Sequence, residues 1–167
     1  MYQIAVENQF DFLSLEYATL HRASWATAFQ HPKWLSALYG QLLTQNAATP
    51  LVVVVRRTSD RSLAMVLPLI RRRYGMLKVV EFADLRVSDY AAVVADRHEA
   101  KALLDDEGIR SELKRLLKPY DVLRIGKVPD DELIDVHEEG MADALEAEHE
   151  MAAQQARAAA PGKGAKP

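Results

Sequence analysis

The stretch that decides the fold is Leu51-Val-Val-Val-Val-Arg56, followed by Arg57-Thr-Ser-Asp60 and then by Leu63-Ala-Met-Val-Leu-Pro-Leu-Ile70. Apolar and largely β-branched residues fill the two outer runs, and Ser and Asp in the link are typical of a turn, so the pattern predicts two strands. Neither run alternates between apolar and polar residues. Both faces of the predicted sheet are therefore apolar, and each face needs a layer that covers it.

Further strands are predicted after this pair. Lys78-Val-Val-Glu-Phe82 predicts a third strand, residues 91–95 predict a short fourth strand, and residues 122–125 predict a last strand that closes on Gly126. Pro68 lacks the N–H that a strand residue gives to its neighbour. We therefore expect the second strand to lie at an edge of the sheet or to be bulged at this residue.

Apolar residues at helical spacing predict helices that could cover this sheet. The first helix is expected at about residues 10–23, with the apolar positions Phe10, Leu13, Tyr17 and Leu20. The second is expected to begin at Pro32, because proline suits the first turn of a helix. The third is expected at 99–117, with Gly108 as a candidate break and Pro119 as its end. Strands and helices together predict an α/β (α+β) protein.

The balance of charge changes at Pro129. Up to residue 128 the chain has 18 Lys and Arg against 14 Asp and Glu, and from residue 129 it has 3 against 10. We therefore expect a mildly basic domain over 1–128, an acidic Ala/Glu-rich helical extension over 129–160 and a disordered tail over 161–167. The basic residues of the domain are scattered, so no nucleic-acid partner is expected.

The composition excludes several classes of protein. The 167 residues suit one domain, and the absence of cysteine excludes a disulfide scaffold, a thiolate metal site and a cysteine nucleophile. The first residues lack the basic start and apolar run of a signal peptide, and no apolar run reaches the roughly 18 residues of a membrane span. We therefore expect a cytoplasmic protein without a membrane span.

Signatures of nucleotide, metal and hydrolase sites are missing from the sequence. Gly162 and Gly164 have G-x-G spacing, but no strand precedes them and no helix follows, so a backbone cradle for phosphate is not expected. His137 and His149 are each followed by Glu without forming an H-E-x-x-H pattern, and no metal is expected. No serine lies in a G-x-S-x-G turn.

Two groups of residues before and after the strand pair are candidates for binding a substrate. Arg71-Arg72-Arg73, just before Tyr74, is either a clamp for phosphate or carboxylate or a charged strand end that discourages edge pairing. Gln30 and Trp34 flank the proline that starts the second helix, and Trp34 is either a ligand platform or a core residue.

A third candidate group follows the third strand and consists of Asp84, Asp89 and Tyr90. Carboxylates and a phenol at the end of a strand could accept a substrate proton or hold a hydroxyl. The alternative is that Asp89 caps a turn while Tyr90 packs beneath it. The sequence leaves both interpretations open.

Six short segments, taken in order, carry a resemblance to a known family. They are Phe29-Gln30-His-Pro32-Lys-Trp34-Leu35, Pro50-Leu-Val-Val-Val-Val-Arg56, Leu67-Pro68-Leu69, Phe82-Ala-Asp84, Asp89-Tyr90 and Asp121-Val-Leu-Arg-Ile125. In this order they resemble the N-terminal half of the CelD/BcsL-type acetyltransferases of cellulose and exopolysaccharide biosynthesis, which are related to the FemABX group. The resemblance covers about residues 7–129.

This resemblance implies a GNAT-like fold, in which a mixed and largely antiparallel sheet is flanked by helices. It implies an acyl-CoA donor such as acetyl-CoA and transfer to an amine or hydroxyl of a sugar-related acceptor. In such two-domain enzymes the acyltransferase motifs belong to the second half, and the resemblance ends near Pro129. We therefore expect a standalone first domain or a truncated or frameshifted product, with an acceptor groove near residues 71–74 and 84–90.

Three functions remain open at this point. The first is an acyltransferase-family protein whose present domain shapes the acceptor side. The second is a non-catalytic binding or assembly module that pairs with a partner carrying the acyl-CoA-binding domain, or with a second copy; the apolar sheet and the small number of helices motivate it. The third is an anion-binding protein that acts through the arginine triplet.

Overall fold

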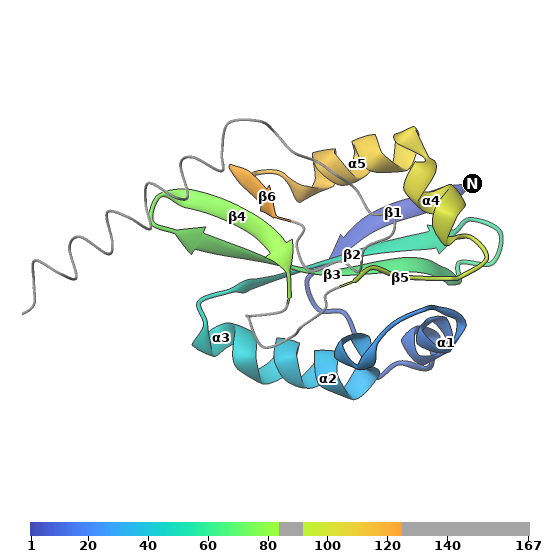
Figure 1. Cartoon of the computed structure of the whole chain (residues 1–167), viewed down its shortest axis with the longest axis horizontal. Helices are drawn as coiled ribbons and strands as arrows, with labels where there is room; N and C mark the ends of the chain where they lie inside the picture. The colour runs from blue at the N-terminus through green and yellow to red at the C-terminus, as the bar shows by residue number, and fades with distance from the viewer. Residues whose placement is uncertain (84–91, 125–167) are drawn as a thin grey trace, which may run out of the picture. The chain divides into compact units, whose positions relative to one another are not determined.

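One mixed sheet of six strands forms the centre of the computed structural model, which describes residues 1–83 and 92–124 (Figure 1). The strands lie in the order β1-β2-β3-β4-β6, and β5 pairs with β3. Neighbouring strands are antiparallel except β4 and β6, which are parallel. The bounds are Tyr2–Glu7 for β1, Thr49–Arg57 for β2, Leu63–Tyr74 for β3, Leu77–Phe82 for β4, Val94–Ala95 for β5 and Val122–Arg124 for β6.

Several predictions fall on residues that the structure does not describe. They are residue 91 of the predicted fourth strand, Ile125 and Gly126 at the predicted last strand, the acidic extension over 129–160 and the tail over 161–167. For the described residues, the prediction of a mixed and mostly antiparallel sheet flanked by helices is confirmed.

The long hairpin of β2 and β3 corresponds to the two strands predicted from the apolar runs that begin at Leu51 and Leu63. Its register places Val54 opposite Val66, and both side chains are fully buried. The turn is closed by Asp60, whose Oδ1 accepts hydrogen bonds from the backbone N–H and the hydroxyl of Ser62. β3 continues beyond the predicted end at Ile70 and includes the arginine triplet.

Pro68 lies in β3, which pairs with β2 on one side and with β4 and β5 on the other. The prediction that this strand lies at an edge of the sheet is therefore wrong. The carbonyl of Pro68 accepts a hydrogen bond from the N–H of Ala83 at 2.9 Å. Since the nitrogen and oxygen of a strand residue point to the same side, its nitrogen also faces away from β2. On that side β5 pairs as far as Val66 and β4 pairs from Leu69 onward. The proline therefore occupies the interval between two partner strands, where the ladder needs no N–H.

Helices cover both faces of the sheet (Figure 1). One face carries α1, the 3₁₀ turn η1, α2, the π-helical turn η2 and α3; the other carries α4 and α5. α2 begins at Pro32, as predicted. The bounds are Leu15–Ala23 for α1, Ala28–Gln30 for η1, Pro32–Ala37 for α2, Leu38–Leu42 for η2, Leu43–Gln45 for α3, Ala100–Asp105 for α4 and Glu107–Leu117 for α5.

Alternate residues of β2 enter separate hydrophobic cores. Val53 belongs to the core beneath α4 and α5, where Leu103 is among its members. Val52 belongs to the core over α1 and α2, where Tyr17 is among its members. Because each fully buried Val contributes about 1.5–3 kcal/mol relative to an exposed one, a sheet with two apolar faces needs both layers. The prediction that each face is covered is confirmed.

The start of the chain differs from the prediction. β1 was not predicted, and it adds an edge strand to β2. α1 begins at Leu15 rather than at residue 10, because Ser14 caps it: Oγ accepts a hydrogen bond from the N–H of Tyr17 at 3.2 Å. Leu13 precedes the cap and is 59% exposed, so its place on the apolar helix face is wrong.

The predicted helix over 99–117 is two helices. The break falls at Asp106 and not at Gly108, which belongs to the first turn of α5. Asp106 Oδ1 accepts a hydrogen bond from the N–H of Ile109 at 3.0 Å and caps α5. A Cβ on Gly108 would come 3.0 Å from this same oxygen, so the glycine leaves room for the cap.

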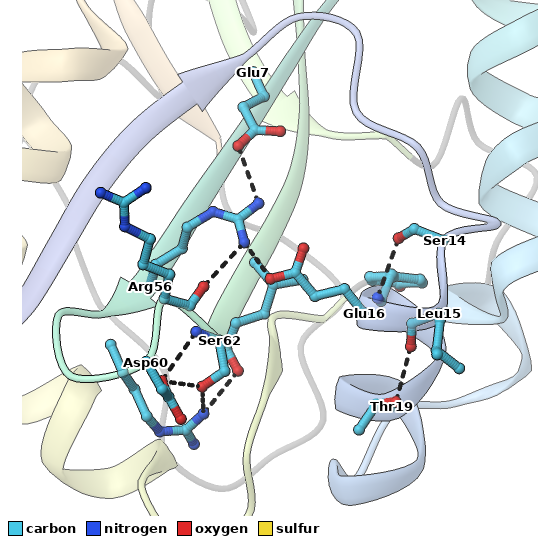
Figure 2. Close-up of polar contacts among 12 residues, drawn as sticks. Glu7, Ser14, Leu15, Glu16, Thr19, Arg56, Asp60 and Ser62 are labelled. Carbon is cyan, nitrogen blue, oxygen red and sulfur yellow. Dashed lines mark hydrogen bonds and ion pairs between the residues drawn. The ribbon is translucent and has the colours of Figure 1, made fainter.

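Two consecutive arginines at the end of β2 connect the sheet to both helical layers. Arg56 pairs with Glu7 of β1 and with Glu16 of α1 (Figure 2). Arg57 pairs with two carboxylates just before α4, those of Asp96 and Glu99, at 3.1 and 2.9 Å.

Candidate functional site

A charged residue is buried near the C-terminal end of β4. Glu81 is 9% exposed, and it lies between Val80 and Phe82 in an otherwise apolar strand end. Its register partner on β3 is Ile70, which packs against the α2–η2–α3 layer. The Glu81 side chain therefore projects to that face of the sheet. Burying a carboxylate costs free energy unless hydrogen bonds or an opposite charge compensate it, so its neighbours matter.

Arg72, Tyr74 and Glu81 form a cluster on this face. The Tyr74 hydroxyl donates a hydrogen bond to Oε1 of Glu81 at 3.1 Å. Arg72 Nη1 lies 3.6 Å from the same oxygen, and the two side chains are 22% and 11% exposed. The Arg72 guanidinium also lies over the Tyr74 ring, 5.2 Å from its centroid, within the range of a cation–π interaction. We call these three residues the Glu81 cluster.

A second arginine stands next to this cluster in the sheet. Arg124 of β6 is the register partner of Glu81 in the parallel ladder, and it is exposed. Side chains of register partners leave a sheet on the same face. Glu81 of β4 thus lies between Arg72 of β3 and Arg124 of β6.

The arginine triplet is divided between the two faces of the sheet. Arg71 and Arg73 alternate with Arg72, so they lie on the face of α4 and α5. Arg71 Nη2 donates a hydrogen bond to the carbonyl oxygen of Leu117 at 2.9 Å, at the C-terminal end of α5. Its Nε is buried without a hydrogen-bond partner. Arg73 is exposed. The three guanidinium groups do not converge on one anion.

Gln30 is buried, and its described contacts lie within the protein. Its Oε1 accepts hydrogen bonds from the backbone N–H and the hydroxyl of Thr27 at 2.9 and 2.7 Å, as part of a capping box. Its carbonyl accepts a hydrogen bond from the Tyr17 hydroxyl at 2.7 Å. These contacts fix the turn between α1 and α2. Its role in substrate binding stays a prediction.

Trp34 is half-buried at the start of α2. Its ring packs edge-on against that of Phe29, with centroids 6.2 Å apart, and it contacts the cores under α2 and η2. Nε1 is buried without a hydrogen-bond partner. The packing is that of a core residue, one of its two predicted interpretations.

Asp84, Asp89 and Tyr90 lie outside the described residues, so their predicted role is not tested. Glu81 was not among the predicted site residues. The signal was present in Lys78-Val-Val-Glu-Phe82, where one carboxylate stands in an apolar strand. Such a residue is either exposed at an edge or buried with partners, and the sequence does not name the partners.

Three further observations apply to the described part of the chain. No group of three or more His, Cys, Asp or Glu side chains there could hold a metal ion. None of its helices has both the length and the apolar character that a membrane crossing requires. Comparisons with protein-family models, curated proteins and solved structures found no match for this chain.

Proposed function

We propose that this chain is a GNAT-like acyltransferase-family protein that provides the acceptor side of a reaction. The reaction transfers an acyl group from acyl-CoA to an amine or hydroxyl of a sugar-related acceptor in polysaccharide biosynthesis. The observation that carries the proposal is the buried Glu81, held by a phenol and a guanidinium on a central part of the sheet. The resemblance of residues 7–129 supplies the reaction class.

The chemistry of the Glu81 cluster suits an acceptor. An amine or hydroxyl that attacks an acyl group must lose a proton, and a positioned carboxylate can accept it. The arginine and tyrosine hold the carboxylate in one orientation, and an aromatic ring beside charged groups is a common surface for a sugar ring or an amine. Strand residues hold such groups more rigidly than loop residues do.

The donor side is proposed to lie on a second domain. The sequence contains no glycine-rich loop between a strand and a helix, which a CoA pyrophosphate would use. We therefore expect weak or no transfer by this chain alone. The described sheet is complete on both faces, which is consistent with a domain that folds independently of the donor side.

Calorimetry with acetyl-CoA and NMR titration with amino sugars and short glucans test this proposal. We expect no donor binding up to millimolar concentration, and acceptor-dependent shifts of Tyr74 and Glu81 resonances that disappear in Glu81→Gln. Glu107→Gln, at an exposed position of α5, is the matched control and should keep the shifts. Acceptor shifts that survive Glu81→Gln, or that occur only away from the Glu81 cluster, would contradict the proposed site.

A binding or assembly module is the second candidate, and the edge strand β1 favours it. The backbone carbonyl of Met1 points toward the β2 side, because it accepts a hydrogen bond from the N–H of Thr58. By alternation, the backbone groups of Tyr2, Ile4 and Val6 point away from β2, and no described strand pairs with them. The strand has no Lys or Pro, which commonly protect an edge from pairing.

Two proline variants distinguish this candidate. Val6→Pro removes an outward N–H and should abolish association with a partner strand while the domain stays folded. Ala5→Pro removes an N–H that faces β2 and should destabilise the domain itself. Sedimentation velocity measures self-association of the wild-type protein, and a pull-down measures capture of a partner. A monomer at all concentrations, together with no capture that Val6→Pro abolishes, would argue against the module.

A further inference from the structure

The imidazole rings of His21 and His31 form a pair for which the proposed function has no role. Their centroids lie 5.6 Å apart, and the ring planes meet at 81°. His21 lies in the last turn of α1, and His31 is the N-cap of α2. The pair therefore connects two helices of the same layer.

One ring nitrogen of His21 has no partner in the protein. This atom, Nε2, is buried and has no hydrogen-bond partner. A hydrogen bond with the backbone of Thr27 raises the pKa of His21. A buried polar atom without a partner is uncommon and calls for an explanation.

His31 caps the next helix through its ring. Its Nδ1 accepts a hydrogen bond from the N–H of Lys33 at 3.3 Å and thereby caps α2. The ring that contacts His21 is therefore also the cap of α2. With Nδ1 as the acceptor, Nε2 of His31 carries the proton, so the two rings cannot both offer Nε2 to a metal ion without loss of the cap.

The surroundings of His21 resist its protonation. Burial lowers the pKa of His21, the charge of His31 lowers it further, and the Thr27 carbonyl offsets these effects only in part. Tyr17 lies 6.3 Å from His21, and it stays neutral because burial raises the pKa of its phenol. The dipole of α1 favours a cation in its last turn, but the direction of the pKa shift shows that burial prevails.

We propose that the contact between His21 and His31 is a pH-sensitive latch between α1 and α2, closed when His21 is neutral and opened when its buried ring takes up a proton. The folded state binds the proton on His21 less readily than the unfolded chain, so the contribution of the latch is present above about pH 6.5 and is lost as the pH falls below it. His21 and His31 flank residues 24–30 in the sequence. This segment contains Trp25, which is 74% exposed, and Phe29, whose ring packs against that of Trp34. Opening would loosen this segment and the packing of Trp34.

Trp34 fluorescence tests the latch in the full chain. The chain has two tryptophans, so Trp25→Phe leaves Trp34 as the only reporter. We expect its emission to change between about pH 7 and pH 5, while far-UV circular dichroism keeps most of its signal. His21→Asn should abolish the change. His31→Asn, which keeps an N-cap acceptor, should reduce its amplitude. His98→Gln, at an exposed position, is the control and should leave the change intact.

NMR titration of the imidazoles gives a readout that does not depend on the variants being stable. In wild-type protein His21 should titrate below pH 6.5, and in His31→Asn its pKa should rise, because a neighbouring positive charge is gone. The latch is refuted by a fluorescence change that persists unaltered in both histidine variants. It is equally refuted by a His21 ring that titrates at its ordinary pKa with and without His31.

Discussion

Arg56 and Arg57 are neighbours in β2, yet their guanidinium groups bind carboxylates on opposite faces of the sheet. Arg57 makes two further hydrogen bonds, from Nη1 to the Ser62 hydroxyl and to the carbonyl oxygen of Leu63. Nearly all of its donors are thus used within the protein. The two arginines hold both helical layers to the sheet at the end of the β2–β3 hairpin.

Replacing Arg57 should measure this connection. Arg57→Ala leaves Asp96 and Glu99 without their cation, and hydrogen bonds to charged groups contribute about 1.5–3 kcal/mol each when well buried. Because the Arg57 side chain is 21% exposed, we expect a loss of about 1–3 kcal/mol in the free energy of unfolding by urea. Lys101→Ala is the control: its pair with Asp105 has side chains 76% and 59% exposed and should contribute almost nothing. Equal losses in the two variants would contradict the connecting role.

The Glu81 cluster should show coupling in a double-mutant cycle. Arg72→Met leaves a buried carboxylate with only the Tyr74 hydroxyl and should destabilise the protein by about 1–3 kcal/mol. Arg72→Met combined with Glu81→Leu should recover most of this loss, since an apolar pair of similar size needs no compensation. Urea unfolding of the two single variants and the double variant gives the coupling free energy. Additive losses would show that the two side chains do not interact.

The effect of Gly108→Ala on stability should depend on whether Asp106 caps α5. In a helix interior, alanine is more stable than glycine by roughly 1 kcal/mol. A Cβ on Gly108 would press on the capping oxygen of Asp106 at 3.0 Å, so Gly108→Ala alone should gain little. Asp106→Ala should cost about 1 kcal/mol by loss of the cap. In that background Gly108→Ala should stabilise the protein by about 1 kcal/mol. Thermal unfolding of the four proteins checks this, and an identical effect of Gly108→Ala in both backgrounds would exclude the proposed contact.

Buried tyrosines should make the protein sensitive to alkali. Burial raises the pKa of Tyr39 well above its ordinary value, and its hydroxyl donates to the Leu69 carbonyl at 2.7 Å. The unfolded chain loses this proton near pH 10 while the folded chain keeps it, so stability should fall as the pH rises beyond about 10. Tyr39→Phe should cost about 0.5–1.5 kcal/mol at neutral pH and flatten the decline above pH 10. Unfolding curves at neutral pH and above pH 10 measure this difference in wild-type protein and in the variant. A loss of stability above pH 10 that is the same in both would show that Tyr39 is not its source.

The sequence predicted the parts of the fold that depend on local pattern. The apolar runs from Leu51 and from Leu63 specify a hairpin, and Pro32 specifies a helix start, because each signal acts over a few residues. β1 has a weaker signal: Tyr2, Ile4 and Val6 alternate with more polar residues, but the strand becomes stable only through pairing with β2.

Features that depend on partners far apart in the chain cannot be predicted from local sequence pattern. Pro68 looked like an edge residue because nothing in its neighbours shows that two strands share one side of β3. Glu81 looked like an ordinary strand charge because its partners on β3 become neighbours only in the folded register. The arginine triplet looked like one cluster because adjacency in sequence means opposite faces in a strand.

The interval at Pro68 has a consequence for how the sheet can change. β3 serves two groups of strands, one with β5 near the arginine pair and one with β4 and β6 near Glu81. Pro68 has no N–H to donate to either group, and its carbonyl accepts a hydrogen bond from Ala83, which directly follows β4. The pairing of β4 with β3 can therefore change without breaking a hydrogen bond between β5 and β3.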